Sequence, residues 1–233
     1  MSTQPPLVVA MLHADEDDID YQLYTQAYGL EMQIDDEWEA EVVLLAPHEH
    51  LASVTENTDV TGEDTAIVSA GVTDIPIRDD GLADVAGLQD ARNNWLLVGD
   101  PRLNDTDDVI NKKLRAALGA GCRAIVCVTD PANEQVAARL DGIESIDRSR
   151  FVIAFVGAGA TAPDVATNTA QIARDRIVSM GATGNPRFIV GGNFSADNAL
   201  ELVAREGIDG VFLMDDKYDG FECILELLET LGE

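Results

Sequence analysis

Histidine and aspartate side chains follow several predicted strands of this 233-residue chain, where they could ligate a metal. All three histidines come after the first two apolar runs, at His13, His48 and His50, while Asp100 and Asp215 follow two later runs. Imidazole and carboxylate groups are common ligands of transition metals, so one hypothesis is a metal-assisted site. The surroundings of His48 and His50 are typical of a helix start, where side chains two positions apart diverge. We therefore favour surface histidines and expect no metal and no other cofactor.

Two adjacent glycines could approach an anion. Gly191 and Gly192 end another apolar run. Without a Cβ atom, backbone N–H groups can come close to a phosphate, which is one way in which barrels bind phosphorylated ligands. A turn that needs a positive φ angle explains the same pair. Both interpretations remain open at this point.

The charge of the chain limits its partners and its surroundings. Forty-three acidic residues against fifteen basic ones give a net charge of -28. Nucleic acid and anionic membranes are excluded as expected partners, because both would repel such a surface. Salt shortens the Debye length to about 3 Å at 1 M, so the acid excess indicates a salt-rich cytoplasm such as that of an extreme halophile. Three cysteines without metal-like spacing agree with a reducing compartment, and no apolar stretch is long enough for a membrane helix.

Short apolar runs alternate with helical patterns along the whole chain. The runs are not alternating in polarity, which is typical of strands buried on both faces. Eight of them are predicted as strands: Leu7–Leu12, Glu41–Ala46, Thr65–Ala70, Trp95–Gly99, Ala124–Thr129, Phe151–Val156, Arg187–Val190 and Gly210–Met214. The clearest helices are Asp107–Gly119, Pro163–Met180 and Asp197–Glu206, the last preceded by Ser195 as a cap. This order predicts a parallel α/β fold, either a barrel or an open sheet, in one domain over residues 1–233 with residues 1–5 flexible.

A resemblance to a known family distinguishes the barrel from the open sheet. Six segments carry a resemblance to the triosephosphate isomerase family, in the family's order: Trp95–Asn104, Asp107–Leu118, Ala124–Val128, Phe151–Phe155, Arg187–Asn193 and Ile208–Leu213. They resemble the stretch from the fourth to the eighth strand and cover most of the C-terminal two thirds of the chain. The resemblance implies a single (β/α)8 barrel with a parallel eight-stranded core, here with shortened loops.

The resemblance also shows which catalytic positions of the family are changed. The family shuttles a proton on a phosphorylated three-carbon sugar with a glutamate base, a neutral histidine and a lid that excludes water. It also has an asparagine and a lysine at the end of the first strand. These two fall on Met11 and His13, the histidine falls on Asp100 with Arg102 following it, and the base falls on Val156. A valine cannot take a proton, and an anionic aspartate cannot polarise a carbonyl as a neutral imidazole does.

Two further features of the family are altered. Gly191 and Gly192 match its seventh-loop glycines, but the eighth-loop glycines fall on Met214 and Asp215, where a carboxylate would repel phosphate. The third loop, which reaches a partner subunit in the family, lacks the usual Phe-Thr-Gly-Glu sequence, so a dimer of the family's kind is not expected.

Three hypotheses follow. The favoured one is a barrel that lacks isomerase activity and binds a protein partner or a small ligand of unknown identity. The second is a barrel enzyme with replaced chemistry, using rim aspartate and histidine side chains. The third is a divergent but genuine triosephosphate isomerase.

Overall fold

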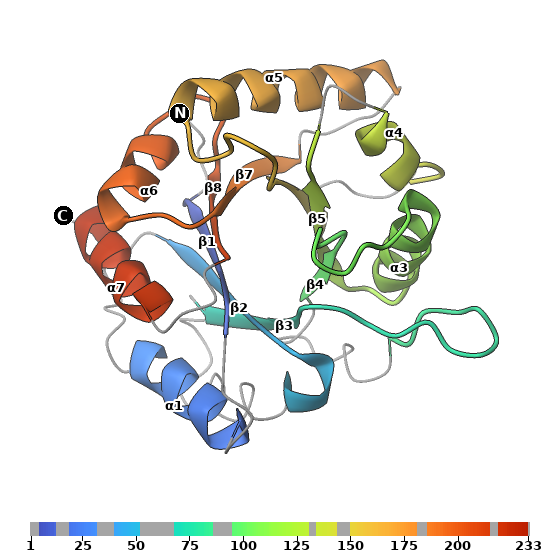
Figure 1. Cartoon of the computed structure of the whole chain (residues 1–233), viewed down its shortest axis with the longest axis horizontal. Helices are drawn as coiled ribbons and strands as arrows, with labels where there is room; N and C mark the ends of the chain where they lie inside the picture. Colours follow the sequence, from blue (N-terminus) through green and yellow to red (C-terminus); the bar gives the residue numbers. More distant parts are fainter. Residues whose placement is uncertain are drawn as a thin grey trace.

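Eight parallel strands close into a barrel in chain order, and helices surround it (Figure 1). The barrel closes because β1 pairs with two strands: Leu7 lies opposite Glu41 of β2 and opposite Gly210 of β8. The computed structural model describes residues 5–12, 19–31, 40–51, 68–85, 95–130, 134–143, 150–180, 186–214 and 219–232. The predicted (β/α)8 barrel is therefore confirmed, and the open sheet is excluded.

The strands lie close to the predicted apolar runs. They are β1 Leu7–Met11, β2 Glu41–Ala46, β3 Val68–Val72, β4 Trp95–Val98, β5 Arg123–Val128, β6 Phe151–Phe155, β7 Arg187–Gly192 and β8 Gly210–Leu213. The third prediction, Thr65–Ala70, was placed too early at its carboxyl end, because Gly71 and Val72 pair in register with Leu45 and Ala46 of β2.

The helices follow their predicted starts more closely than their ends. The described helices are α1 Ile19–Glu31, the short 3-10 helix η1 His48–His50, α3 Asp107–Gly119, α4 Gln135–Arg139, α5 Pro163–Ser179, α6 Ala196–Val203 and α7 Asp219–Gly232. Ser195 caps α6, its hydroxyl accepting the N–H of Asn198 at 3.3 Å. The predicted Asp197–Glu206 was too long, since the Arg205 N–H turns back to the Leu202 carbonyl at 3.0 Å.

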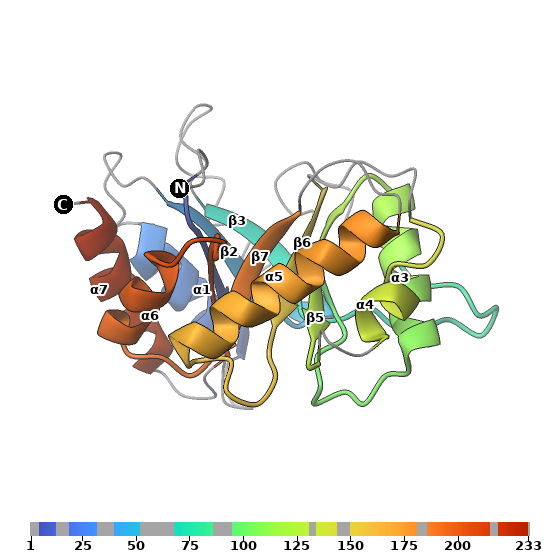
Figure 2. The ribbon, with the colours of Figure 1, turned by 90° about the horizontal axis from the view of Figure 1, so that it is seen from above.

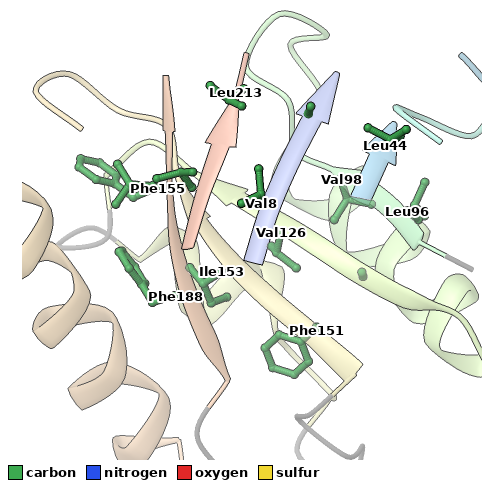
Figure 3. Close-up of a cluster of buried hydrophobic side chains, with 14 of the residues drawn as sticks. Val8, Leu44, Leu96, Val98, Val126, Phe151, Ile153, Phe155, Phe188 and Leu213 are labelled. Carbon is green, nitrogen blue, oxygen red and sulfur yellow. The ribbon is translucent and has the colours of Figure 1, made fainter. Parts of the chain in front are cut away.

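Successive strand residues point alternately into the barrel and outward to the helices. The inward set contains Val9, Leu97 and Ile189, which form a core of their own. The outward set packs under the helices, and Figure 3 shows part of it, with Val8 on β1, Val126 on β5 and Phe188 on β7. In the side view, α5 lies obliquely across the outside of the barrel beside β6 and β7 (Figure 2). This double burial explains why the strands read as continuous apolar runs.

The amino end of the barrel is closed by an ion-pair network. Glu41, at the start of β2, binds Arg123 of β5 at 2.9 Å and Arg187 of β7 at 2.7 Å, one carboxylate oxygen to each. The guanidinium of Arg123 also lies over the ring of Trp95, 4.2 Å from its centroid. This charged floor is located at the opposite end of the barrel from the residues discussed below.

The segment after β3 forms a hairpin-like arm that projects beyond the ring of helices (Figure 1). Ile77 and Ala83 form an antiparallel bridge across it, and Gly81 at its tip has a φ of 76°. The arm is fastened to α3 at its base, where the buried ammonium of Lys113 binds Asp74 at 2.6 Å and Asp105 at 2.7 Å.

Within the residues that the structure describes, none of the helices has the length and apolar character required to cross a membrane.

Candidate functional site

Residues from five strands gather at the carboxyl end of the barrel, because all parallel strands end there. Met11 is the last residue of β1, and Asp100 comes two residues after β4. Val156 and Met214 directly follow β6 and β8, and Gly191 lies near the end of β7. The structure thus brings together most of the rim positions that the sequence had singled out.

Asp100 is buried and held by Arg102. Its side chain is only 4% exposed, and its two carboxylate oxygens accept three guanidinium hydrogen bonds from Arg102, of 3.1, 3.1 and 2.7 Å. The backbone N–H of Arg102 donates a further bond of 2.9 Å. Such a two-pronged, charge-assisted pair engages both carboxylate oxygens as acceptors. A ligand that bound to Asp100 would therefore have to compete with Arg102 for these oxygens.

A tight turn at the end of β4 positions this pair. Gly99 has a φ of 78°, a conformation that residues with a side chain rarely adopt. The chain then turns, with the Leu103 N–H bonded to the Asp100 carbonyl at 3.1 Å, before the hydroxyl of Thr106 caps α3. The turn brings Arg102 back over the barrel mouth, where its guanidinium Nη2 lies 2.7 Å from the Sδ atom of Met11.

Apolar side chains close the mouth of the barrel. Met11, Val156 and Met214 are partly buried and pack on the interior core. None of these side chains can act as an acid or base. At the ends of β1, β6 and β8 the barrel consequently offers thioether and methyl groups to a ligand.

The space beside Gly191 is filled from two sides. A Cβ atom added there would lie 2.5 Å from Cγ1 of Val156 and 3.2 Å from Sδ of Met214. At Gly192 the added atom would lie 2.8 Å from Cγ2 of Thr161. Close packing is a sufficient reason for glycine at both positions, and neither has a positive φ. The turn interpretation of the pair is therefore wrong, whereas phosphate binding stays a prediction.

Arg139 stabilises the carboxyl end of β5. This buried residue donates to the Cys127 carbonyl at the end of β5 and, through Nε, to Asp107 at 2.7 Å. It ties the carboxyl end of β5 to the start of α3. Burial raises the pKa of the Cys127 thiol far above its ordinary value, and the nearby charge of Asp100 adds to this effect. Cys127 is therefore not a nucleophile at neutral pH.

The histidines are not assembled into a metal site in the described part of the chain. His48 and His50 lie in η1, where a helical turn points their side chains in different directions, as the sequence predicted. His13 and Asp215 fall outside the described residues. Among the residues that the structure does describe, no three His, Cys, Asp or Glu side chains are grouped to hold a metal ion.

Sequence reasoning found the rim positions but missed how they interact. It named Arg102 as following Asp100 without pairing the two side chains, although a spacing of two residues across a turn allows such a pair. It treated Met214 only as a lost glycine, whereas its side chain packs beside Gly191. Neither contact has a signal in the periodicity, because both depend on the turn geometry and on strands that are distant in the sequence.

The fold and the rim define a parallel eight-stranded (β/α)8 barrel with a mouth lined by methionine and valine and an ion pair. The family model described as triosephosphate isomerase matches residues 22–216. The chain belongs to the triosephosphate isomerase family.

Pairwise comparison with individual triosephosphate isomerases agrees with this membership, although the sequence identities are low. The triosephosphate isomerase of Pelobacter propionicus is 30% identical over 158 residues, 57% of this chain and 63% of that protein. Those of Mycoplasma pneumoniae and Corynebacterium efficiens are 28% and 27% identical, covering 72% and 77% of this chain and 77% and 79% of theirs. The alignment with the first of these relatives thus covers less than two thirds of its length.

Proposed function

We propose that this member of the family does not isomerise triose phosphates and acts as a binding or interaction protein. The observation that carries the proposal is the Asp100–Arg102 pair, because it occupies the position where the family presents a neutral histidine. An aspartate whose two oxygens accept four hydrogen bonds cannot polarise a substrate carbonyl.

The neighbouring positions support the same proposal. Proton abstraction from carbon needs a base within hydrogen-bond reach of the substrate, and Val156 has no titratable group. Met11 provides a thioether where the family has an amide, and that thioether contacts Arg102. If a single position were misaligned, a nearby rim residue could take over its role. The changed positions lie on three separate strands, β1, β4 and β6, so one misalignment does not account for all of them.

The names of the relatives favour a second candidate, a divergent triosephosphate isomerase. The two candidates differ in one measurable property, the conversion of glyceraldehyde 3-phosphate at high salt. We expect no conversion above that of a matched preparation from cells without the gene. An isomerase known to tolerate the same salt serves as the positive control.

Conversion above background would contradict the proposal if it comes from this protein. Asp100→Asn tests the source, because a contaminating isomerase would be unaffected by a change in this chain. Activity that copurifies with the protein and falls in the variant would establish the divergent isomerase.

Replaced chemistry at the rim makes a different prediction. If aspartate and histidine side chains held a catalytic metal, protein purified without chelator would contain a stoichiometric transition metal. We expect a metal content well below one per chain by elemental analysis.

We also propose a cytoplasmic location with high salt. The net charge of -28 supports it, since screening at molar salt reduces self-repulsion. The free energy of unfolding should rise with KCl, which thermal melts across a salt series would measure.

A further inference from the structure

The arm after β3 and helix α3 enclose a groove on the outside of the barrel (Figures 1 and 2). Its walls are residues between 78 and 85 of the arm and residues between 108 and 116 of α3, and we refer to it as the arm groove. Its volume of about 890 Å³ falls within the range of small-molecule sites, about 300–1,000 Å³. Asp100, Arg102 and Val156 do not line it, so it is distinct from the mouth of the barrel.

Helix α3 presents two unpaired cations to the arm groove. Lys112 and Arg115 are both exposed, and their spacing of three residues places them on the same face of the helix. In the described part of the chain, every other lysine and arginine side chain except Arg176 makes an ion pair or a hydrogen bond, whereas these two make none. Acidic residues outnumber basic ones by 43 to 15, so a cation in this chain has many carboxylates to choose from. Lys112 and Arg115 therefore remain available to a ligand.

The arm has a defined shape because of its own hydrogen bonds. The N–H of Arg78 donates to the Leu82 carbonyl at 2.9 Å, and the N–H of Asp84 donates to the Pro76 carbonyl at 2.9 Å. The carboxylate of Asp80 accepts the N–H of Leu82 at 3.0 Å and binds the guanidinium of Arg78 at 3.0 Å. This wall of the groove is thus formed before a ligand binds, which lowers the entropy lost on binding.

The arm groove also has apolar surface. Leu82 is 59% exposed, although a leucine side chain gains free energy when it is removed from water. Ala83 and Val85 line the groove on the arm, and Ala116 lines it on α3. Apolar walls combined with a few charged groups are typical of sites that bind small organic molecules.

The charged residues of the lining favour a ligand with a single negative charge. Lys112 and Arg115 can bind one carboxylate between them, and the planar guanidinium matches the geometry of a carboxylate. Asp84 and Asp108 also line the groove, so a ligand with a second negative charge would be repelled. A monocarboxylate is therefore better suited to the groove than a phosphate dianion.

We propose that the arm groove binds a small amphipathic monocarboxylate, with its carboxylate at Lys112 and Arg115 and its apolar chain along Leu82 and Val85. In molar salt the Debye length is about 3 Å, so such a ligand responds to the cations that it touches and little to the net charge of -28. The proposal does not depend on whether the rim isomerises a substrate, because the groove lies outside the mouth.

Titration of the whole chain with octanoate in about 2 M KCl, followed by the chemical shifts of the backbone amides in NMR spectra, tests the proposal. The shifts should saturate with a Kd below about 1 mM and should be confined to residues 78–85 and 108–116. Acetate has the charge without the apolar chain, and octanamide has the chain without the charge. Each should bind at least about fivefold more weakly than octanoate.

Variants of the two cations and of the apolar wall locate the ligand. Arg115→Gln and Lys112→Gln should each weaken octanoate binding at least about fivefold, and both keep a good helix former at an exposed position. Arg176→Gln is the matched control, since Arg176 is exposed on α5 and likewise lacks a partner among the described residues. Leu82→Ser should also weaken binding, whereas Val178→Ser on α5, at a residue 66% exposed, should not.

Four results would each overturn the proposal. They are octanoate shifts that do not saturate, shifts centred outside the arm and α3, equal affinity for acetate and octanoate, and the same loss of affinity in Arg176→Gln as in Arg115→Gln.

Discussion

Removing the Arg102 side chain should destabilise the protein more than its own exposure suggests. Arg102→Met leaves Asp100, which is 4% exposed, without its guanidinium partner. Breaking a buried pair costs about 3–5 kcal/mol, but Arg102 is 39% exposed and its backbone N–H would still bind Asp100. We therefore expect a loss of about 2 kcal/mol, which lowers Tm by about 4–8 °C in a domain of this size.

Arg205→Met is the matched control for this prediction. Arg205 is 42% exposed, close to Arg102, but its partners Glu201 and Asp164 are 56% and 95% exposed. An exposed pair contributes little, so the control should lose less than about 0.5 kcal/mol. Thermal unfolding of both variants in the same molar KCl measures the difference.

A double-mutant cycle separates the pair from other effects of the substitution. Asp100→Asn removes the charge that Arg102 neutralises, so the combined variant should be more stable than the sum of the two losses predicts, by about 1 kcal/mol. Equal losses in Arg102→Met and Arg205→Met, or strict additivity in the cycle, would refute the reasoning that burial of Asp100 makes its pairing important.

Two further predictions concern packing and pH. Gly191→Ala places a methyl group 2.5 Å from Val156 and should lower the free energy of unfolding, measured in urea, by about 1–3 kcal/mol. Adding Val156→Ala should recover most of this loss. A loss that stays the same in the double variant would contradict the clash with Val156 as its cause. Burial alone would lower the pKa of Lys113, but its bonds to Asp105 and Asp74 outweigh burial and raise it. Because the pKa is raised in the folded state, the stabilisation is fully present below the unfolded lysine pKa of about 10.4. It is lost as the pH rises through the higher pKa of the folded state. The advantage of wild type over Lys113→Met, about 1–2 kcal/mol near pH 8, should thus shrink near pH 11, and a constant difference would be evidence against it.

Much of the barrel could be predicted from the sequence because burial on two faces leaves continuous apolar runs. Runs such as Phe151–Phe155 are short and rich in aromatic and β-branched residues, as is typical of a strand buried on both faces. The helix starts were also predictable where a local rule acts, as with the Ser195 cap and Pro163 in the first turn of α5. Closure into a barrel was not, since periodicity is the same in an open sheet; it needed the resemblance to the family.

The chemistry of the rim was predictable only as a set of positions. Asp100 and Val156 could be aligned with catalytic residues, but the contacts that Arg102 makes depend on the turn set by Gly99. The role of Gly191 was also ambiguous, because close packing and phosphate binding require the same residue.

The charged floor has a consequence for how the barrel comes apart. Glu41 belongs to β2, whereas Arg123 and Arg187 belong to β5 and β7, the strands on either side of β6 in the opposite wall. If two neighbouring strands separated, β2 would move relative to β5 and β7. This movement would strain the ion pairs that Glu41 makes with Arg123 and Arg187. Separation of one strand pair thus affects strands on the opposite side of the barrel, and we expect the barrel to unfold in a single cooperative step.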